Sequence, residues 1–230
     1  MTLTDLILPK RGIALPEMPS YIKLDMAFGL GSGTTLFDKS RYKSHGTISG
    51  ASWASGAHGY CLDFDESALD HVEIPATHTQ LNFTSEDFSL IARIRSDWLI
   101  AGRFIFNRRF SKIDGWSIRL TGDGKILVQT SQAGVDQQTQ SSADDIVIDN
   151  WYTVGFSRSG ASITLFKNGV DVTSAAGTHI DPASSTRSAY IGIYDGEAIY
   201  PWAGQIEFLR VFGGIALSAS EHLAYHNALD

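Results

Sequence analysis

Apolar and polar residues alternate at every second position in several segments of the chain. In one of them, Trp116, Ile118 and Leu120 share one face, while Ser117 and Arg119 share the other. A period of two residues is typical of a β-strand that buries one face. Further strand-like segments lie at 88–95, 125–129, 151–157, 162–167, 189–193 and 204–212. The pattern therefore predicts an all-β chain.

Turn residues join these predicted strands into hairpins. Residues 122–124 (Gly-Asp-Gly) and 168–169 (Asn-Gly) both favour tight turns. Because no helical period separates the strands, we expect two antiparallel sheets packed as a β-sandwich. A short C-terminal helix is predicted over 222–229, after a capping box of Ser218 and Glu221. Two polar stretches are predicted to be loops, at 132–145 and 174–188.

The N-terminal segment differs from the rest of the chain. Pro9, Pro16 and Pro19 are half of the six prolines, and proline fixes φ and removes a backbone donor, which disfavours a regular helix. We therefore divide the chain into an extended arm, 1–21, and one sandwich domain, 22–230. The arm either packs on its own domain or reaches a neighbouring protein subunit and buries its aliphatic side chains there. These side chains are Leu6, Ile7, Leu8, Ile13 and Leu15.

Short motifs within the strands follow one another in a recognisable order. They include Asp-His-Val-Glu-Ile at 70–74, Leu-Phe-Lys-Asn-Gly at 165–169, and the strand at 202–212 that begins Trp-Ala-Gly-Gln-Ile. In order and spacing, over about residues 24–229, these motifs resemble the laminin-G-like, concanavalin-A-like lectin/glucanase superfamily. The resemblance implies a jelly roll, in which two antiparallel sheets form the sandwich.

Composition narrows the range of partners. The chain has 230 residues, 43% of them hydrophobic, and a formal charge of −7. An acidic chain argues against nucleic acid as a partner, and no apolar run approaches the roughly 20 residues of a membrane span. The single cysteine, Cys61, excludes an intramolecular disulfide. No secretory signal is apparent, so the localisation stays open, with a virion surface as one possibility.

Motifs for catalysis are missing from the sequence. Retaining glycosidases of this fold carry Glu-x-Asp-x-(x)-Glu on one strand, so that period-two spacing points the carboxylates into one cleft. The nearest cluster here, Asp-Phe-Asp-Glu at 63–66, is expected at a strand end. A Gly-x-Ser-x-Gly nucleophile motif is also absent. We therefore expect the protein not to be an enzyme.

The resemblance also implies a possible calcium ion at the rim of the sandwich. Asp38 stands where the superfamily has an early aspartate, and Glu207 stands where a late aspartate is usual. Oxygen ligands of this kind suit Ca²⁺, which would then fix loops. The alternative is that Asp38 caps a turn through its own side chain.

Saccharide sites combine an aromatic face with polar side chains for the hydroxyl groups. The loop at 194–202 has this composition, with Trp202 expected in the core. A second cluster is Asn-Arg-Arg at 107–109, whose adjacent arginines face opposite sides of a strand. The candidate ligand-binding residues are Tyr194, Asp195, Tyr200, Asn107 and Arg109.

Three functional hypotheses follow from the sequence. The first is a non-catalytic recognition or adhesion domain that binds a glycan or another surface polymer. The alternative is a structural virion protein, either a capsid decoration or a tail-associated protein, that uses its N-terminal arm for assembly. A glycoside hydrolase is the third and the least supported, because the paired carboxylates are not found on one strand.

Overall fold

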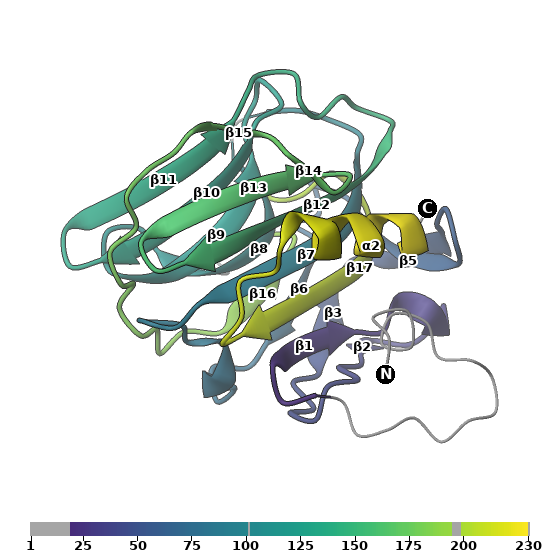
Figure 1. Ribbon diagram of the computed structural model, residues 1–230. Coiled ribbons are helices and arrows are strands. Elements are labelled where there is room, and N and C mark those ends of the chain that lie inside the picture. The colour runs from purple at the N-terminus through teal and green to yellow at the C-terminus, as the bar shows by residue number, and fades with distance from the viewer. Residues whose placement is uncertain (1–18, 101, 195–198, 230) are drawn as a thin grey trace.

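A computed structural model describes residues 19–100, 102–194 and 199–229. Two antiparallel sheets pack face to face, and one α-helix follows at the C-terminus (Figure 1). This architecture confirms the predicted all-β sandwich with a short C-terminal helix. The arm side chains of Leu6, Ile7, Leu8, Ile13 and Leu15 lie outside the described residues, so the arm stays a prediction.

The first sheet, sheet A, has eight strands in the order β14-β13-β12-β7-β17-β5-β4, and β1 also pairs with β17. Its centre is the long pair β7 and β17, aligned from Phe88 opposite Gly213 to Ser96 opposite Gly204. The strands of sheet A are β1 (Ile22–Met26), β4 (Ser52–Ser55), β5 (Tyr60–Phe64), β7 (Phe88–Ser96), β12 (Trp151–Ser159), β13 (Ser162–Lys167), β14 (Val170–Asp171) and β17 (Gly204–Gly213).

The second sheet, sheet B, has nine strands in the order β15-β11-β10-β9-β8-β16-β6-β3-β2. Its strands are β2 (Thr35–Leu36), β3 (Gly46–Ser49), β6 (His71–Ile74), β8 (Arg103–Phe110), β9 (Asp114–Leu120), β10 (Ile126–Gln132), β11 (Val135–Ser141), β15 (Thr173–Ala175) and β16 (Ala189–Ile191). Two 3₁₀ turns, η1 (Phe28–Leu30) and η2 (Thr79–Leu81), lie in the connections.

The core lies between the two sheets and is built from the apolar face of each strand. Trp116 is fully buried, and its ring lies 4.8 Å from the ring of Phe106 and 5.1 Å from that of Phe88. Its indole nitrogen donates a hydrogen bond to the carbonyl of Leu81 at 3.0 Å. Trp202 is also fully buried, in agreement with its predicted position in the core.

One predicted loop is in fact a strand. Residues 135–141 form β11, which pairs with β10 from Val135 opposite Gln132 to Gln140 opposite Leu127. The sequence of β11 is Val-Asp-Gln-Gln-Thr-Gln-Ser, which has no apolar alternation because its side chains do not fill the main core. The prediction of a loop over 132–145 was therefore wrong for this part. The stretch 174–188 is largely a loop, and β15 overlaps its start.

The helix α2 (Ala219–Leu229) packs on the outer face of sheet A, against β7, β12 and β14 (Figure 1). Its capping box is present, since Ser218 donates its backbone N–H to the Glu221 carboxylate at 2.7 Å. Under the helix lies a second apolar cluster, separate from the core. This cluster contains Ile22, Ile91, Phe208, Phe212, Leu217 and Tyr225. None of the helices in the described residues is long and apolar enough to cross a membrane.

A buried ion pair ties sheet A to this helix. Asp25 of β1 lies opposite Arg210 of β17, and both side chains are almost fully buried. The guanidinium donates through Nε to Asp25 Oδ1 at 2.9 Å and through Nη1 to the Tyr225 hydroxyl at 3.0 Å. Burial by itself lowers the pKa of Arg210, but Asp25 and Tyr225 more than offset this and raise it. Arg210 is therefore charged inside the protein.

Candidate functional site

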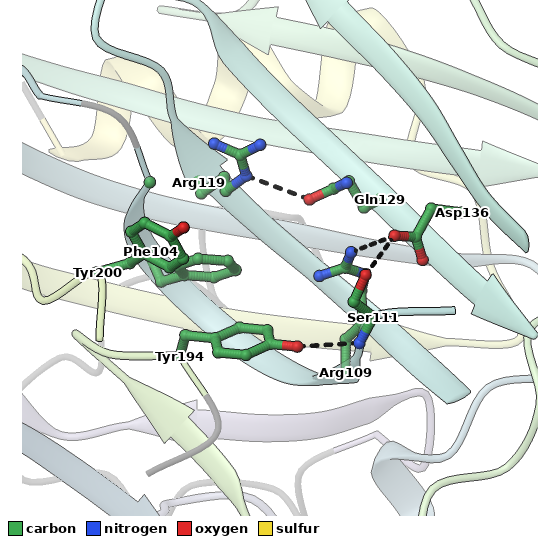
Figure 2. Close-up of a pocket in the computed structure, with 9 residues that line it drawn as sticks. Phe104, Arg109, Ser111, Arg119, Gln129, Asp136, Tyr194 and Tyr200 are labelled. Atoms are coloured by element: carbon green, nitrogen blue, oxygen red, sulfur yellow. Dashed lines mark hydrogen bonds and ion pairs between the residues drawn. The ribbon is translucent and has the colours of Figure 1, made fainter. Parts of the chain in front are cut away.

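A pocket of about 390 Å³ opens on the outer face of sheet B. The helix α2 lies on the other side of the sandwich, against sheet A. Four adjacent strands, β8 to β11, supply its floor, and the connection after β16 supplies two tyrosines (Figure 2). The volume lies within the range of roughly 300–1,000 Å³ that is usual for small-molecule sites. The lining residues are Gly102, Phe104, Arg109, Ser111, Arg119, Gln129, Asp136, Tyr194 and Tyr200.

Three aromatic rings line one side of the pocket. The ring of Phe104 lies 5.1 Å from that of Tyr194 and 6.3 Å from that of Tyr200. Tyr200 is 50% exposed, so this tyrosine is open to solvent at the pocket. Its backbone has a φ of 56°, a conformation that costs free energy in a non-glycine residue. A Cβ on Gly102 would lie 2.4 Å from Tyr200 Cδ1, so the tyrosine ring needs glycine at this position.

Polar groups on the other side of the pocket hold one another in place. Arg109 pairs with Asp136 at 2.8 Å, and the Ser111 hydroxyl donates to the same carboxylate at 2.7 Å. The backbone N–H of Lys112 donates to Asp136 at 2.7 Å. The Ser111 N–H donates to the Tyr194 hydroxyl at 2.9 Å. These bonds fix the polar side of the pocket to its aromatic side before any ligand binds.

Asp136 has a lowered pKa. Burial raises its pKa, but hydrogen bonds from Ser131, Ser111 and Lys112, together with the charge of Arg109, lower the pKa to about 2. The carboxylate is therefore ionised at neutral pH and accepts hydrogen bonds without carrying a proton. A general acid for glycoside cleavage needs the opposite shift, a raised pKa. Asp136 is thus equipped to orient groups and not to donate a proton.

Arg119, on β9, lines the pocket beside Gln129. Its Nε donates to the amide oxygen of Gln129 at 3.1 Å, and its guanidinium carbon lies 5.8 Å from the ring centre of Phe104. Burial lowers the pKa of Arg119, the nearby charge of Arg109 lowers it further, and Tyr200 acts in the opposite direction. The pocket therefore contains a cation in a partly desolvated position.

The structure brings three of the predicted binding residues together and separates the others. Tyr194, Tyr200 and Arg109 all line this pocket, and Asp195 lies outside the described residues. Asn107 does not line it: this side chain is fully buried and donates to the carbonyl of Arg109 at 3.1 Å. The structure thus corrects the prediction for Asn107, which shares a face with Arg109 but lies beneath the surface.

Neighbouring Arg108 behaves as the alternation of a strand requires. It points away from the pocket and donates to the Asn82 side chain at 2.7 Å. Sequence reasoning missed six of the lining residues: Gly102, Phe104, Ser111, Arg119, Gln129 and Asp136. The alternation of β9 indicates that Arg119 faces away from the core. Its contact with Gln129, however, depends on the pairing of β9 with β10. Asp136 was missed because β11 was predicted to be a loop.

Asp38, a candidate calcium ligand, caps a turn. Its Oδ1 accepts hydrogen bonds from the backbone N–H groups of Asp25 and Ser40, at 2.9 and 2.8 Å. Its Oδ2 accepts from the Ser40 hydroxyl and the Ser44 N–H, at 2.7 and 2.8 Å. Four protein donors therefore surround a carboxylate that is only 2% exposed. Capping of a turn is the role that the sequence analysis gave as the alternative to calcium binding for Asp38.

Glu207, the second candidate calcium ligand, has a different set of partners. It pairs with Arg93 at 2.9 Å and accepts from the Ala57 N–H at 2.7 Å. Among the residues that the structure describes, no group of three or more His, Cys, Asp or Glu side chains is arranged to hold a metal ion. Calcium binding stays a prediction, and the geometry favours a structural role for both carboxylates without it.

Replacing Asp38 by alanine separates the two roles. We expect a loss of about 3 kcal/mol in the free energy of unfolding, because three buried backbone donors lose their acceptor. Denaturant unfolding with calcium and with a chelator measures the loss, and we expect equal values. Asp65→Ala is the matched control, since Asp65 caps an exposed turn at Ser67, and its loss should be much smaller. Calcium that raises wild-type stability and leaves Asp38→Ala unchanged would identify Asp38 as a ligand.

A second hollow, of about 530 Å³, is lined largely by carboxylates. Burial raises the pKa of Asp63, as does the negative charge of Asp97. Glu66 pairs with Arg103, and Asp97 pairs with Arg95. The 63–66 cluster does lie at a strand end, since β5 ends at Phe64. These carboxylates therefore lack the alignment along one strand face that the retaining glycosidases use.

Fold and sequence together define the class of this protein. A double-sheet jelly roll is shared by several classes of protein, among them viral capsid and lectin domains. The model of the concanavalin A-like lectin/glucanases superfamily matches residues 66–221. The chain belongs to this superfamily, as the motifs in its sequence predicted. No curated protein sequence matches the chain.

Solved structures with the same fold include two toxin domains. The binding domain of Paraclostridial Mosquitocidal Protein 1 has a TM-score of 0.74 at 14% identity, covering 91% of this chain and 52% of that one. The binding domain of botulinum neurotoxin DC, solved in complex with SialylT, has a TM-score of 0.66 at 15% identity, with 92% and 52% covered. The present chain therefore spans about half the length of these domains.

A third similar structure is matched over almost its whole length. Domain 4 of AbnA, a GH43 extracellular arabinanase from Geobacillus stearothermophilus, was solved in complex with arabinotriose. It has a TM-score of 0.60 at 17% identity, covering 89% of this chain and 98% of that one. At these identities the likeness concerns the fold alone.

Proposed function

We propose that this protein is a non-catalytic recognition domain that binds a saccharide in the pocket on sheet B. The observation that carries the proposal is the pairing of an exposed aromatic side chain, Tyr200, with fixed polar groups across one small pocket. A sugar ring offers an apolar C–H face for the aromatic ring and hydroxyl groups for Asp136, Gln129 and the arginines. Binding needs little rearrangement, because the polar side is already held by internal hydrogen bonds.

The chemistry of the pocket favours binding over hydrolysis. Its described lining has one carboxylate, Asp136, and the pKa of that group is lowered to about 2. Cleavage of a glycosidic bond generally uses two carboxyl groups on either side of the bond, one of them with a raised pKa. Solved structures of the same fold in complex with arabinotriose and with SialylT add support at the level of analogy.

Tyr200→Ala tests the proposal. We expect the variant to lose about tenfold in affinity for any saccharide that the wild type retains on a glycan array, because the stacking face is removed. Isothermal titration with the best array ligand measures the loss. Tyr200→Phe keeps the ring and should keep most of the affinity.

Tyr60→Ala is the matched control for this test. Tyr60 is also 50% exposed, but it lies on β5 in sheet A, so its removal should leave binding unchanged. Thermal melting of each variant checks the fold. If the array and a panel of polysaccharides give no binding, or if Tyr60→Ala weakens binding as much as Tyr200→Ala, the proposal is wrong. Release of reducing sugar from that panel would revive the hydrolase hypothesis.

The alternative hypothesis, a structural virion protein that assembles through its N-terminal arm, rests on residues 1–21. All but three of these residues lie outside the described part of the chain. It stays a prediction, and it is compatible with saccharide binding, because a surface-displayed domain can do both. Partners that are neighbouring protein subunits belong to the same prediction.

A further inference from the structure

The pocket on sheet B contains more positive than negative charge. Two arginines, Arg109 and Arg119, line it together with a single carboxylate, Asp136. Arg109 uses that carboxylate, at 2.8 Å, and its Nε donates to the Ser131 hydroxyl at 2.7 Å. The positive charge of Arg109 is therefore neutralised within the protein, and that of Arg119 is not matched by a second carboxylate in the lining.

Arg119 has one hydrogen-bond partner in the described structure, the amide oxygen of Gln129, which its Nε reaches at 3.1 Å. Among the described residues, no carboxylate lies within ion-pair distance of its guanidinium, and its two terminal nitrogens point away from Gln129 (Figure 2). The remaining neighbours are the neutral ring of Phe104, at 5.8 Å, and a second cation, Arg109. Arg119 thus lines the pocket with terminal donors that no described residue accepts from.

A guanidinium in this position recognises an anion. Its planar donors match the two oxygens of a carboxylate or a sulfate, which they bind side by side. Arg119 is partly desolvated and lies near a second cation, Arg109. Water therefore stabilises the charge of Arg119 only in part, and an anion bound beside it stabilises that charge further. The protein as a whole has a formal charge of −7. Attraction of an anion therefore depends on this local arrangement and not on the net charge.

We propose that the pocket selects acidic saccharides, with Arg119 binding the carboxylate or sulfate group while Tyr200 stacks on the sugar ring. This inference rests on the proposed saccharide-binding function and adds the charge class of the ligand. The exposed side chain of Tyr200 and the terminal donors of Arg119 line the same pocket. A neutral sugar would offer Arg119 hydroxyl oxygens as acceptors but no opposite charge.

Matched pairs of saccharides test the charge class. We expect the wild type to bind a uronate-containing or sialylated oligosaccharide at least tenfold more tightly than the same oligosaccharide with its carboxyl group methyl-esterified, because a hydrogen bond to a charged group is lost. A sulfated oligosaccharide and its desulfated form make the second pair, and the two pairs distinguish carboxylate from sulfate as the anion. Raising the salt concentration should weaken the acidic members selectively.

Arg119→Gln removes the charge and keeps a polar side chain. We expect it to reduce the preference for the acidic member of each pair by about tenfold or more, with neutral binding little changed. Arg119→Lys keeps a charge and should retain part of the preference. Arg95→Gln is the matched control: Arg95 lies in sheet A, in surface pairs with Asp97 and Asp149, so its loss changes the net charge by the same amount away from the pocket. Melting curves confirm that each variant is folded.

The outcomes separate this inference from the function on which it rests. If no saccharide of either charge binds to the wild type, the proposed function fails, and the inference falls with it. If neutral and acidic members bind equally, with Tyr200→Ala weakening both and Arg119→Gln neither, saccharide binding holds and the charge selection is overturned. The same applies if Arg95→Gln reduces acidic binding as much as Arg119→Gln.

Discussion

Replacing Asp25 by alanine should lower the free energy of unfolding by about 3–5 kcal/mol, which is a large part of the stability of an ordinary domain. The reason is that Arg210 would keep its charge in a site that is only 3% exposed. Its Nε and Nη2 would both lose their partner, Asp25 Oδ1, which now lies 2.9 Å from each. The Asp25 pair also joins β1 to β17 beneath Tyr225 of α2. Denaturant unfolding measures the loss.

Two further variants show whether the lost counter-ion is the cause. The double change Asp25→Leu with Arg210→Met removes both charges, and it should cost clearly less than Asp25→Ala alone. Asp97→Ala breaks the pair with Arg95, in which Asp97 is 46% exposed, and this loss should stay within about 1 kcal/mol. Equal losses for the single and the double change at the buried pair would contradict this explanation.

Acid should destabilise the protein through two buried histidines. Burial lowers the pKa of His222 to about 3. Burial also lowers the pKa of His179 to about 4, with the charge of Arg158 adding to the effect. His222 stacks on Phe166 at 3.9 Å and contacts the Ser157 hydroxyl at 2.9 Å. Both rings are therefore neutral in the folded protein near neutral pH.

The direction of the pH effect follows from proton binding. In the unfolded chain each histidine takes up a proton near pH 6.5, whereas in the folded protein it does so only near pH 4 or pH 3. Between these values the unfolded state binds more protons, so stability is complete above pH 6.5 and falls as the pH decreases. At about 1.4 kcal/mol per pH unit for each histidine, the loss from pH 6.5 to pH 4.5 is about 5 kcal/mol.

Denaturant unfolding at half-unit pH steps measures this loss. His222→Gln should flatten the slope by about half, whatever its effect on stability at pH 7. His58→Gln is the control, because that side chain is 45% exposed, and it should leave the slope unchanged. A stability that is constant between pH 6.5 and 4.5 would show that the two rings are protonated in the folded state. The lowered pKa of Asp136 acts in the same direction, but only below about pH 4.

Most of the fold could be predicted from the sequence because its strands bury one face. Trp116, Ile118 and Leu120 alternate with polar residues, and all three are fully buried. The Ser218 capping box likewise marked the start of α2. The strand β11 was not predicted, because its polar residues carry no alternation, and backbone pairing with β10 and β15 holds it in the sheet. Backbone pairing of this kind leaves no mark in a hydrophobic pattern.

The candidate site was less predictable, because it depends on register and on which face a loop covers. Aromatic and polar composition led to Tyr194, Tyr200 and Arg109, which do meet in one pocket. Arg119 and Asp136 come from neighbouring strands whose alignment the sequence does not specify. Asn107 has the composition of a sugar-binding residue, but it is covered by its surroundings. Burial of an outward-facing residue is a tertiary property that period-two spacing cannot reveal.

The ends of the two sheets bear on the solubility of the protein. Within the described residues, the strand order of sheet A ends at β14 and β4 and that of sheet B at β15 and β2, and none of these four strands is longer than four residues. The remaining edge strand of the described part, β1, pairs only with β17 and has five residues. Unpaired backbone groups along a long, flat edge recruit strands from other molecules, and very short edge strands deny them that template. The protein should therefore resist fibril formation, even when many copies are held close together at high local concentration.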